Sequence, residues 1–118
     1  MGLVQLRVRL VDSVSVAEVD GELDASNVDD VLSQLVAKMS NHAPGLVLDL
    51  APTQYLDSAG VRVLFELARL LRSRRQELRL AVPADGIVRK VLVLTAVADV
   101  VPLHESVESA VAAMRPRD

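Results

Sequence analysis

Polar and apolar residues alternate from Val4 to Leu10, with Val and Leu on one face and Gln and Arg on the other. This pattern is typical of a half-buried β-strand. A turn at 12–13 separates it from a second such segment, Val14 to Val19, so the two predict an antiparallel hairpin. The alternation slips at Ala17, where we expect a β-bulge, and the stretch GELD at 21–24 then ends the pattern.

Four later segments carry apolar residues at the three- and four-residue spacing of helices. The first is predicted from about 27 to 40, with Ser26 as its N-cap, and the second from Ser58 to Ser73. The second has only a narrow polar line, so we expect it to be mostly buried. The third helix is expected to follow a cap at Asp85, and the last a cap at Ser106.

Short apolar runs between these helices predict further strands at 46–50, 78–82 and 100–103. The last is assigned to an edge because Pro102 has no N–H to donate to a neighbouring strand. The segments 41–45 and 51–57 are expected to be loops. The resulting order, β-β-α-β-α-β-α-β-α, predicts an α/β fold in which the later strands pair in parallel through right-handed crossovers.

The chain has 118 residues, which suits a single domain spanning 1–118. The last four residues, RPRD, are expected to fray. The net charge of −3 and the near absence of aromatic side chains argue against a nucleic-acid partner. The N-terminus does not resemble a signal peptide, and no apolar run reaches the ~18 residues of a membrane span. With no cysteine, the composition fits a reducing compartment, and we expect a cytoplasmic location without membrane contact.

Catalytic sites find little support in the sequence. A serine nucleophile needs a base, and the two histidines, His42 and His104, lie in a loop and near a late strand. Gly60 stands alone where a phosphate-binding loop would have several glycines and a lysine. The acidic residues show no metal-ligand spacing. We therefore expect no enzymatic activity, no cofactor and no metal.

Two stretches remain as candidates for function, GELD at 21–24 and LDSAG at 56–60. Both come between a predicted strand and a helix, and loops at the same ends of parallel strands converge on one edge of a sheet. Ser58 is expected at a helix N-terminus, where free N–H groups favour an anion. In isolation, this serine would be interpreted as an N-cap worth ~1 kcal/mol.

These stretches resemble the STAS domain family, and within it the bacterial anti-sigma factor antagonists. The resemblance extends over GELDASNVDDV, LVLDLAPTQYLDSAGVRVLFEL and VRKVLVLTAVADVVPLHESVESAV. It implies a mixed β-sheet with helices packed mainly on one face. The most specific part is D-S-x-G, which marks the serine that is phosphorylated in this family, and Ser58 matches it. Ala96 departs from the family, which often has Gly there, so the end of the third helix is expected to differ.

The resemblance implies an antagonist that binds an anti-sigma factor serine kinase and thereby releases a sigma factor. The kinase phosphorylates Ser58 and inactivates the antagonist, and a PP2C-type phosphatase restores it. ATP belongs to the kinase. The alternative is a STAS module that acts as a scaffold or small-ligand sensor in a signalling assembly. The expected partner-binding residues are Asp24, Ala25, Ser26, Asn27, Asp57, Ser58, Gly60, Arg62, Glu66 and Arg69.

Overall fold

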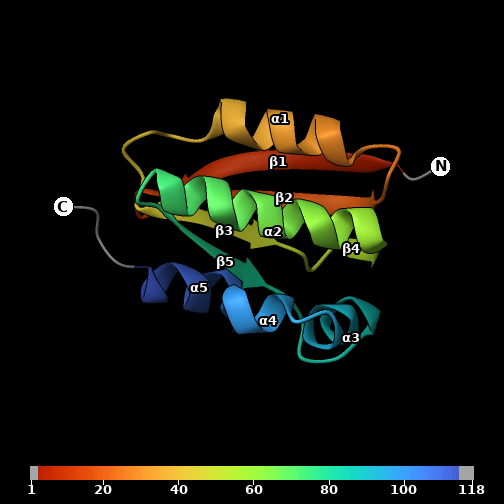
Figure 1. Ribbon diagram of the computed structural model, residues 1–118. Coiled ribbons are helices and arrows are strands. Elements are labelled where there is room, and N and C mark those ends of the chain that lie inside the picture. The colour runs from red at the N-terminus through yellow and green to blue at the C-terminus, as the bar shows by residue number, and fades with distance from the viewer. Residues whose placement is uncertain (1–2, 115–118) are drawn as a thin grey trace.

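The computed structural model describes residues 3–114, which form one mixed sheet of six strands with five helices (Figure 1). The strands are β1 (Val4–Val11), β2 (Val14–Leu23), β3 (Gly45–Asp49), β4 (Thr53–Leu56), β5 (Glu77–Ala81) and β6 (Leu103–His104), and the helices are α1 (Val28–Lys38), α2 (Ser58–Ser73), α3 (Ile87–Leu94), α4 (Val97–Val100) and α5 (Val107–Ala113). The sheet order is β1-β2-β3-β5-β6, with β4 also paired to β2. Only β1 and β2 are antiparallel, so the predicted hairpin and the predicted parallel strands are both confirmed.

The hairpin is regular, and the bulge expected at Ala17 is wrong. Val8 pairs directly with Ala17, and the register continues without interruption to Val4 and Gly21. The polarity pattern slips at Ala17 because β2 is covered on both faces there, so apolar and small residues point both ways. A register irregularity does occur in β2, but it lies between Gly21 and Glu22, where β2 pairs with β4.

Strand β4 lies in the segment that the sequence predicted as a loop, 51–57. It exists because β2 does not end at Val19 but continues to Leu23 and offers a second partner beyond the end of β3. Thr53 fixes the start of β4 by donating its hydroxyl to the Val19 carbonyl over 2.6 Å. Gly21 has φ +121°, and a Cβ there would lie 2.1 Å from the carbonyl oxygen of Leu3, so β2 can continue past this point only with glycine.

The helices cover the two faces of the sheet unequally. Residues from α1, α2, α3 and α4 join the main core with strand residues such as Leu46, Leu48 and Leu80. In Figure 1, α1 and α2 run side by side across this face. Helix α5 packs on the opposite face, where Ala110 and Val111 meet a smaller core. The prediction of helices mainly on one face is confirmed, with α5 as the exception.

Several expected helix caps and the last strand are wrong by one or a few residues. Asn27 rather than Ser26 precedes α1, and Gly86 rather than Asp85 precedes α3. Ser106 does cap α5, accepting a hydrogen bond from the Ser109 N–H over 3.0 Å. The strand expected at 100–103 is instead the end of α4 followed by the short β6, because contact with β5 begins only where the Leu80 N–H donates to the Pro102 carbonyl over 3.0 Å and Leu103 pairs with Leu80. The expected fraying falls on 115–118, outside the described residues.

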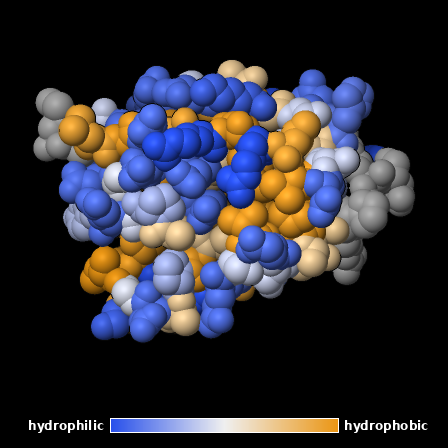
Figure 2. All heavy atoms as spheres, turned by 180° about the vertical axis from the view of Figure 1, so that it is seen from behind, coloured by the Kyte–Doolittle hydropathy of each residue, from blue (hydrophilic) through white to orange (hydrophobic). Residues whose placement is uncertain are grey.

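Helix α3 leaves a group of large apolar side chains exposed to solvent. Figure 2 shows apolar atoms at its lower left, the side on which Figure 1 places α3. Helix α3 carries three of the exposed large apolar residues, Ile87, Val93 and Leu94; the others among the described residues are Leu3, Leu10 on β1, Tyr55 on β4 and Val100 on α4. Between residues 3 and 114, no helix combines the length and hydropathy that a membrane span requires.

Candidate functional site

The ends of β2 and β4 bring the two candidate loops together. Leu23 pairs with Leu56 in parallel register, and the Asp57 N–H donates to the Leu23 carbonyl over 3.3 Å. The loop after β2 therefore meets the start of α2, as expected for loops at the same ends of parallel strands.

Asp57, not Ser58, is the N-cap of α2, so the interpretation of Ser58 as a cap is wrong. Asp57 has extended backbone angles, and its Oδ1 accepts a hydrogen bond from the Gly60 N–H over 3.0 Å. Its Oδ2 accepts a second hydrogen bond from the Ala25 N–H over 3.3 Å. One half-buried carboxylate thus caps the helix and holds the β2–α1 loop against it.

Ser58 is the first residue of α2 and is exposed to solvent. Its hydroxyl makes no hydrogen bond to any residue from 3 to 114. Because Asp57 already occupies the capping position, modification of Ser58 would break no side-chain contact there. The helix dipole and the N–H groups of the first turn favour negative charge at this position.

Gly60 has a structural reason to be glycine. It is buried, and a Cβ at this position would lie 2.8 Å from the Leu23 carbonyl oxygen and 3.0 Å from Cβ of Leu56. The missing side chain lets the first turn of α2 pack directly on the end of β2. Gly60 therefore contributes to the site by allowing this close approach.

The β2–α1 loop is ordered by its own polar side chains. The Asp24 Oδ1 accepts hydrogen bonds from the Ser26 N–H over 2.9 Å and from the Ser26 hydroxyl. The Asn27 amide accepts from the Asp24 N–H over 3.1 Å and donates to the Glu22 carbonyl over 2.8 Å. Ala25 and Ser26 remain exposed next to Asp57.

The three charged residues predicted on α2 form an exposed stripe leading away from Ser58. Arg62 Nε and Glu66 Oε1 are 3.6 Å apart in an i,i+4 ion pair, and Arg69 is exposed farther along. The structure therefore brings the loop residues together with Asp57, Ser58 and Gly60. The charged stripe continues from this group along the exposed side of α2. The pairing of β2 with β4, which holds these parts together, was missed from the sequence, and the Thr and Tyr of TQYL were its only signal.

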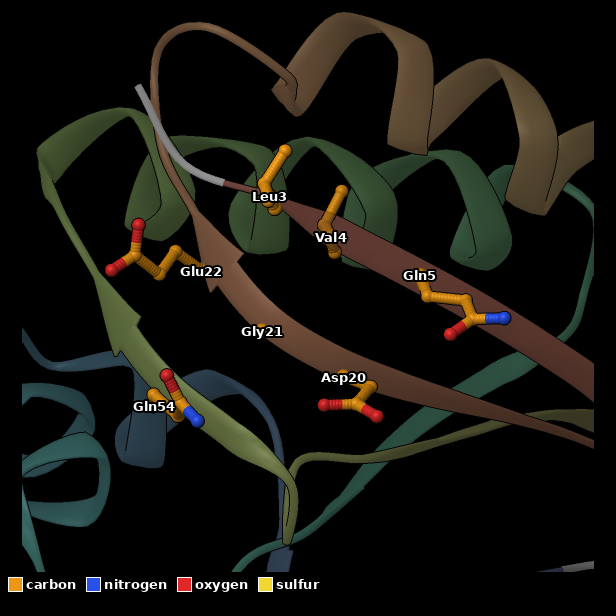
Figure 3. Close-up of a pocket in the computed structure, with 7 residues that line it drawn as sticks. All are labelled: Leu3, Val4, Gln5, Asp20, Gly21, Glu22 and Gln54. Carbon is orange, nitrogen blue, oxygen red and sulfur yellow. The ribbon is translucent and has the colours of Figure 1, made fainter.

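A hollow of about 450 Å³ lies beside this site (Figure 3). Its lining residues, labelled in Figure 3, come from β1, β2, β4 and the residue before β1: Leu3, Val4, Gln5, Asp20, Gly21, Glu22 and Gln54. None of them belongs to the ten predicted contact residues.

A serine and a histidine do meet elsewhere, on α5 and β6, but not as a nucleophile and its base. Arg79 Nη1 lies 3.2 Å from His104 Nε2, and because a guanidinium only donates, Nε2 accepts. The proton is then on Nδ1, which donates to the Ser109 hydroxyl over 3.0 Å. A general base would present an unprotonated nitrogen to that hydroxyl. Burial, and secondly Arg79, lower the pKa of His104, which favours this neutral form.

Metal binding finds no support in the part of the chain that the structure describes. No three His, Cys, Asp or Glu side chains within residues 3–114 gather as metal ligands would. The chemistry available near Ser58 is therefore that of an exposed hydroxyl, a fixed carboxylate and a charged helix surface.

Comparisons with known proteins agree with this geometry. The family model described as the STAS domain matches residues 5–110. The chain is 29% identical over 112 residues to BtrV of Bordetella bronchiseptica, named as a candidate anti-sigma factor antagonist, and the match covers 95% of this chain and 96% of BtrV. A crystal structure of an anti-sigma factor antagonist from Mycobacterium paratuberculosis has 25% identity and a TM-score of 0.85, with 96% and 95% of the two chains covered.

The fold is also shared with SpoIIAA, an anti-sigma factor antagonist. Its unphosphorylated form is 19% identical with a TM-score of 0.72, and 91% of this chain and 93% of SpoIIAA are covered. The phosphorylated Bacillus form has a TM-score of 0.64 at the same identity and covers 96% and 100% of the two chains. These relatives are named as antagonists of anti-sigma factors and not as enzymes.

Proposed function

The chain belongs to the STAS domain family, and we propose that it is an anti-sigma factor antagonist switched by phosphorylation of Ser58. In this proposal the unmodified chain binds an anti-sigma factor that is also a serine kinase, and so frees a sigma factor. The kinase transfers the γ-phosphoryl group of its ATP to the Ser58 hydroxyl and releases ADP. A PP2C-type phosphatase hydrolyses the phosphoserine and restores binding.

The observation that carries the proposal is that Asp57, and not Ser58, makes the structural hydrogen bonds at the start of α2. Asp57 makes the hydrogen bonds that hold the two loops, whereas the Ser58 hydroxyl is exposed and unengaged within residues 3–114. A kinase therefore has access to Ser58 without disturbing the fold.

The electrostatics explain how one phosphate would act as a switch. A phosphoserine adds about −1.5 to −2 charges at pH 7. The helix N-terminus tolerates that charge, so α2 need not melt. A partner, however, would meet added bulk and charge directly beside the Asp57 carboxylate. Binding is then lost by repulsion at the interface, with little change inside the domain.

The test uses the purified chain and each anti-sigma factor kinase encoded in the source genome, with ATP. We expect one of these kinases to phosphorylate Ser58, as located by tandem mass spectrometry, and expect Ser58→Ala to remain unmodified. Phosphate found on Ser13, Ser26 or Ser73, with Ser58 unmodified, would contradict the proposal.

Calorimetry with the same kinase tests the switch itself. The parent and Ser58→Ala are expected to bind alike, and the phosphorylated chain more weakly, by at least about tenfold. Ser58→Asp is expected to weaken binding only in part, because a carboxylate carries less charge than a phosphate. Equal affinities for the phosphorylated and unmodified forms would favour the scaffold or sensor alternative.

A further inference from the structure

Helix α3 leaves several large apolar side chains in solvent. Ile87, Val93 and Leu94 are 58%, 56% and 84% exposed, whereas only Val88 and Leu92 of this helix are buried. At 100° per residue, Ile87, Lys90, Val93 and Leu94 project away from the buried pair and form what we call the α3 face. Exposed apolar side chains grouped on one face of a helix indicate an interaction site more strongly than single scattered ones do.

The α3 face is exposed although the helix itself is firmly placed. Val88 and Leu92 are part of the main core, and Arg89 donates hydrogen bonds to the carbonyls of Pro83 over 2.7 Å and Val82 over 3.0 Å. These contacts fix the rotation of α3 about its axis. The exposed side chains therefore cannot turn toward the core, and only another molecule would cover them.

The α3 face adjoins the site at Ser58. Helix α3 packs against β4, which leads directly into Asp57 and Ser58. Tyr55 on this strand is 47% exposed and lies only three residues before Ser58, about 10 Å along an extended strand. An interface of ordinary size buries about 800 Å² on each partner, roughly 30 Å across, which is wide enough to include Ser58, Tyr55 and α3.

We propose that the α3 face is a second part of the docking surface for the anti-sigma factor that binds at Ser58. The inference rests on the proposed function and adds an apolar contact region to the proposed docking surface. The Ser58 region and the α2 stripe are polar, and polar surfaces mainly set association rate and partner choice. A few well-packed, desolvated residues near an interface centre supply most of the affinity, and apolar area buried beside them adds about 25 cal/mol per Å².

The charge of this face favours a different protein over a second copy of the chain. Lys90 lies between the apolar residues, and it is exposed. In a two-fold dimer centred on this face, Lys90 would lie near the axis, because it is in the middle of α3, and it would approach its own copy. We therefore expect a partner whose apolar surface carries a carboxylate opposite Lys90.

The experiment compares the double variant Ile87→Ser, Leu94→Ser with Leu10→Ser. Leu10 is a matched control because it is 65% exposed but lies on β1. Each folded variant is titrated with the kinase that phosphorylates Ser58 in the parent chain. We expect the double variant to bind about tenfold more weakly or worse, Leu10→Ser to bind like the parent, and Lys90→Glu to associate more slowly at low salt.

The outcomes separate this inference from the proposed function. If the parent binds the kinase and is phosphorylated on Ser58, but the double variant binds equally well, the α3 face is not part of the interface. If the parent self-associates in sedimentation experiments and only that association is lost in the double variant, a second copy covers the face and the inference is overturned. If the parent binds no anti-sigma factor kinase, the proposed function fails and this inference with it. Circular dichroism and chemical unfolding confirm that each variant is folded.

Discussion

At the residue scale, three residues of D-S-x-G have three different roles. Asp57 caps α2 and binds the neighbouring loop, Gly60 permits close packing on Leu23, and Ser58 makes no side-chain hydrogen bond within residues 3–114. The sequence predicted the importance of this stretch but not which residue caps the helix. Asp and Ser are both good N-caps, and a helix start is uncertain by a residue or two from sequence. The same ambiguity led to Ser26 and Asp85 in place of Asn27 and Gly86.

Removing the cap and removing the hydroxyl should therefore affect stability differently. Asp57→Ala loses the hydrogen bonds from Gly60 and Ala25, so its free energy of unfolding should fall by at least about 1 kcal/mol. Ser58→Ala removes an exposed hydroxyl without a partner in residues 3–114 and should change stability by less than about 0.5 kcal/mol. Urea unfolding of both variants provides the measurement. A larger loss for Ser58→Ala than for Asp57→Ala would return the capping role to Ser58.

A second residue-scale prediction concerns Ala96. This residue follows α3 with φ +66°, in the left-handed region that favours glycine, and it stands where the family often has Gly. Left-handed backbone costs alanine roughly 1 kcal/mol or more, part of which is offset because glycine is freer in the unfolded chain. Ala96→Gly should therefore stabilise the protein by roughly 0.5 kcal/mol in thermal or urea unfolding. The control Ala37→Gly, exposed in α1, should destabilise it, and a destabilised Ala96→Gly would contradict the prediction.

At the element scale, the strands with local signals were predicted and those that depend on distant partners were not. The hairpin alternates clearly, and the apolar runs at 46–50 and 78–82 lie within a residue of β3 and β5. Strand β4 has four residues, and its pairing partner is the far end of β2, which becomes available only because Gly21 lets β2 continue. The two-residue β6 likewise depends on β5. Sequence patterns register local periodicity but not such long-range pairing.

The junction of β5, β6 and α5 should give the protein a pH-dependent stability through His104. The pKa of this histidine is lowered in the folded protein, first by burial and then by Arg79, from an ordinary value of 6.5. Below about 6.5 the unfolded chain then binds more protons than the folded chain, so the free energy of unfolding falls as the pH is lowered through this window. Above 6.5 the contribution is fully present.

His104→Gln should flatten this dependence. The free energy of unfolding, measured by urea between about pH 8 and about pH 5, should fall less with decreasing pH in the variant than in the parent. His42→Gln, in an exposed loop, measures what the loss of a histidine does by itself. Equal slopes for the parent and His104→Gln would remove His104 from the explanation.

At the scale of the whole molecule, β4 connects two surface features, because the exposed Ser58 at the start of α2 follows it directly and α3 packs against it. The sequence predicted the convergence of the two loops, because loops at the same ends of parallel strands meet. It did not predict the α3 face, because an apolar residue on a helix indicates burial unless the packing around it is known. The ten proposed contact residues remain a prediction that binding experiments must test. The most direct of these experiments changes the α2 stripe, Arg62, Glu66 and Arg69.

Reversing the charges of the α2 stripe should alter partner binding without unfolding the domain. In Arg62→Glu, Glu66→Arg, Arg69→Glu, the i,i+4 ion pair keeps opposite charges, now with the acid nearer the N-terminus, the more favourable order. All three side chains are exposed, so circular dichroism and stability should resemble those of the parent. Against the anti-sigma factor kinase, the association rate should fall, and the difference from the parent should shrink as salt is raised above about 0.15 M, because screening weakens exposed charges. A folded triple variant that binds as tightly and as fast as the parent would exclude the stripe and restrict the polar part of the docking surface to Ser58 and the loops beside it.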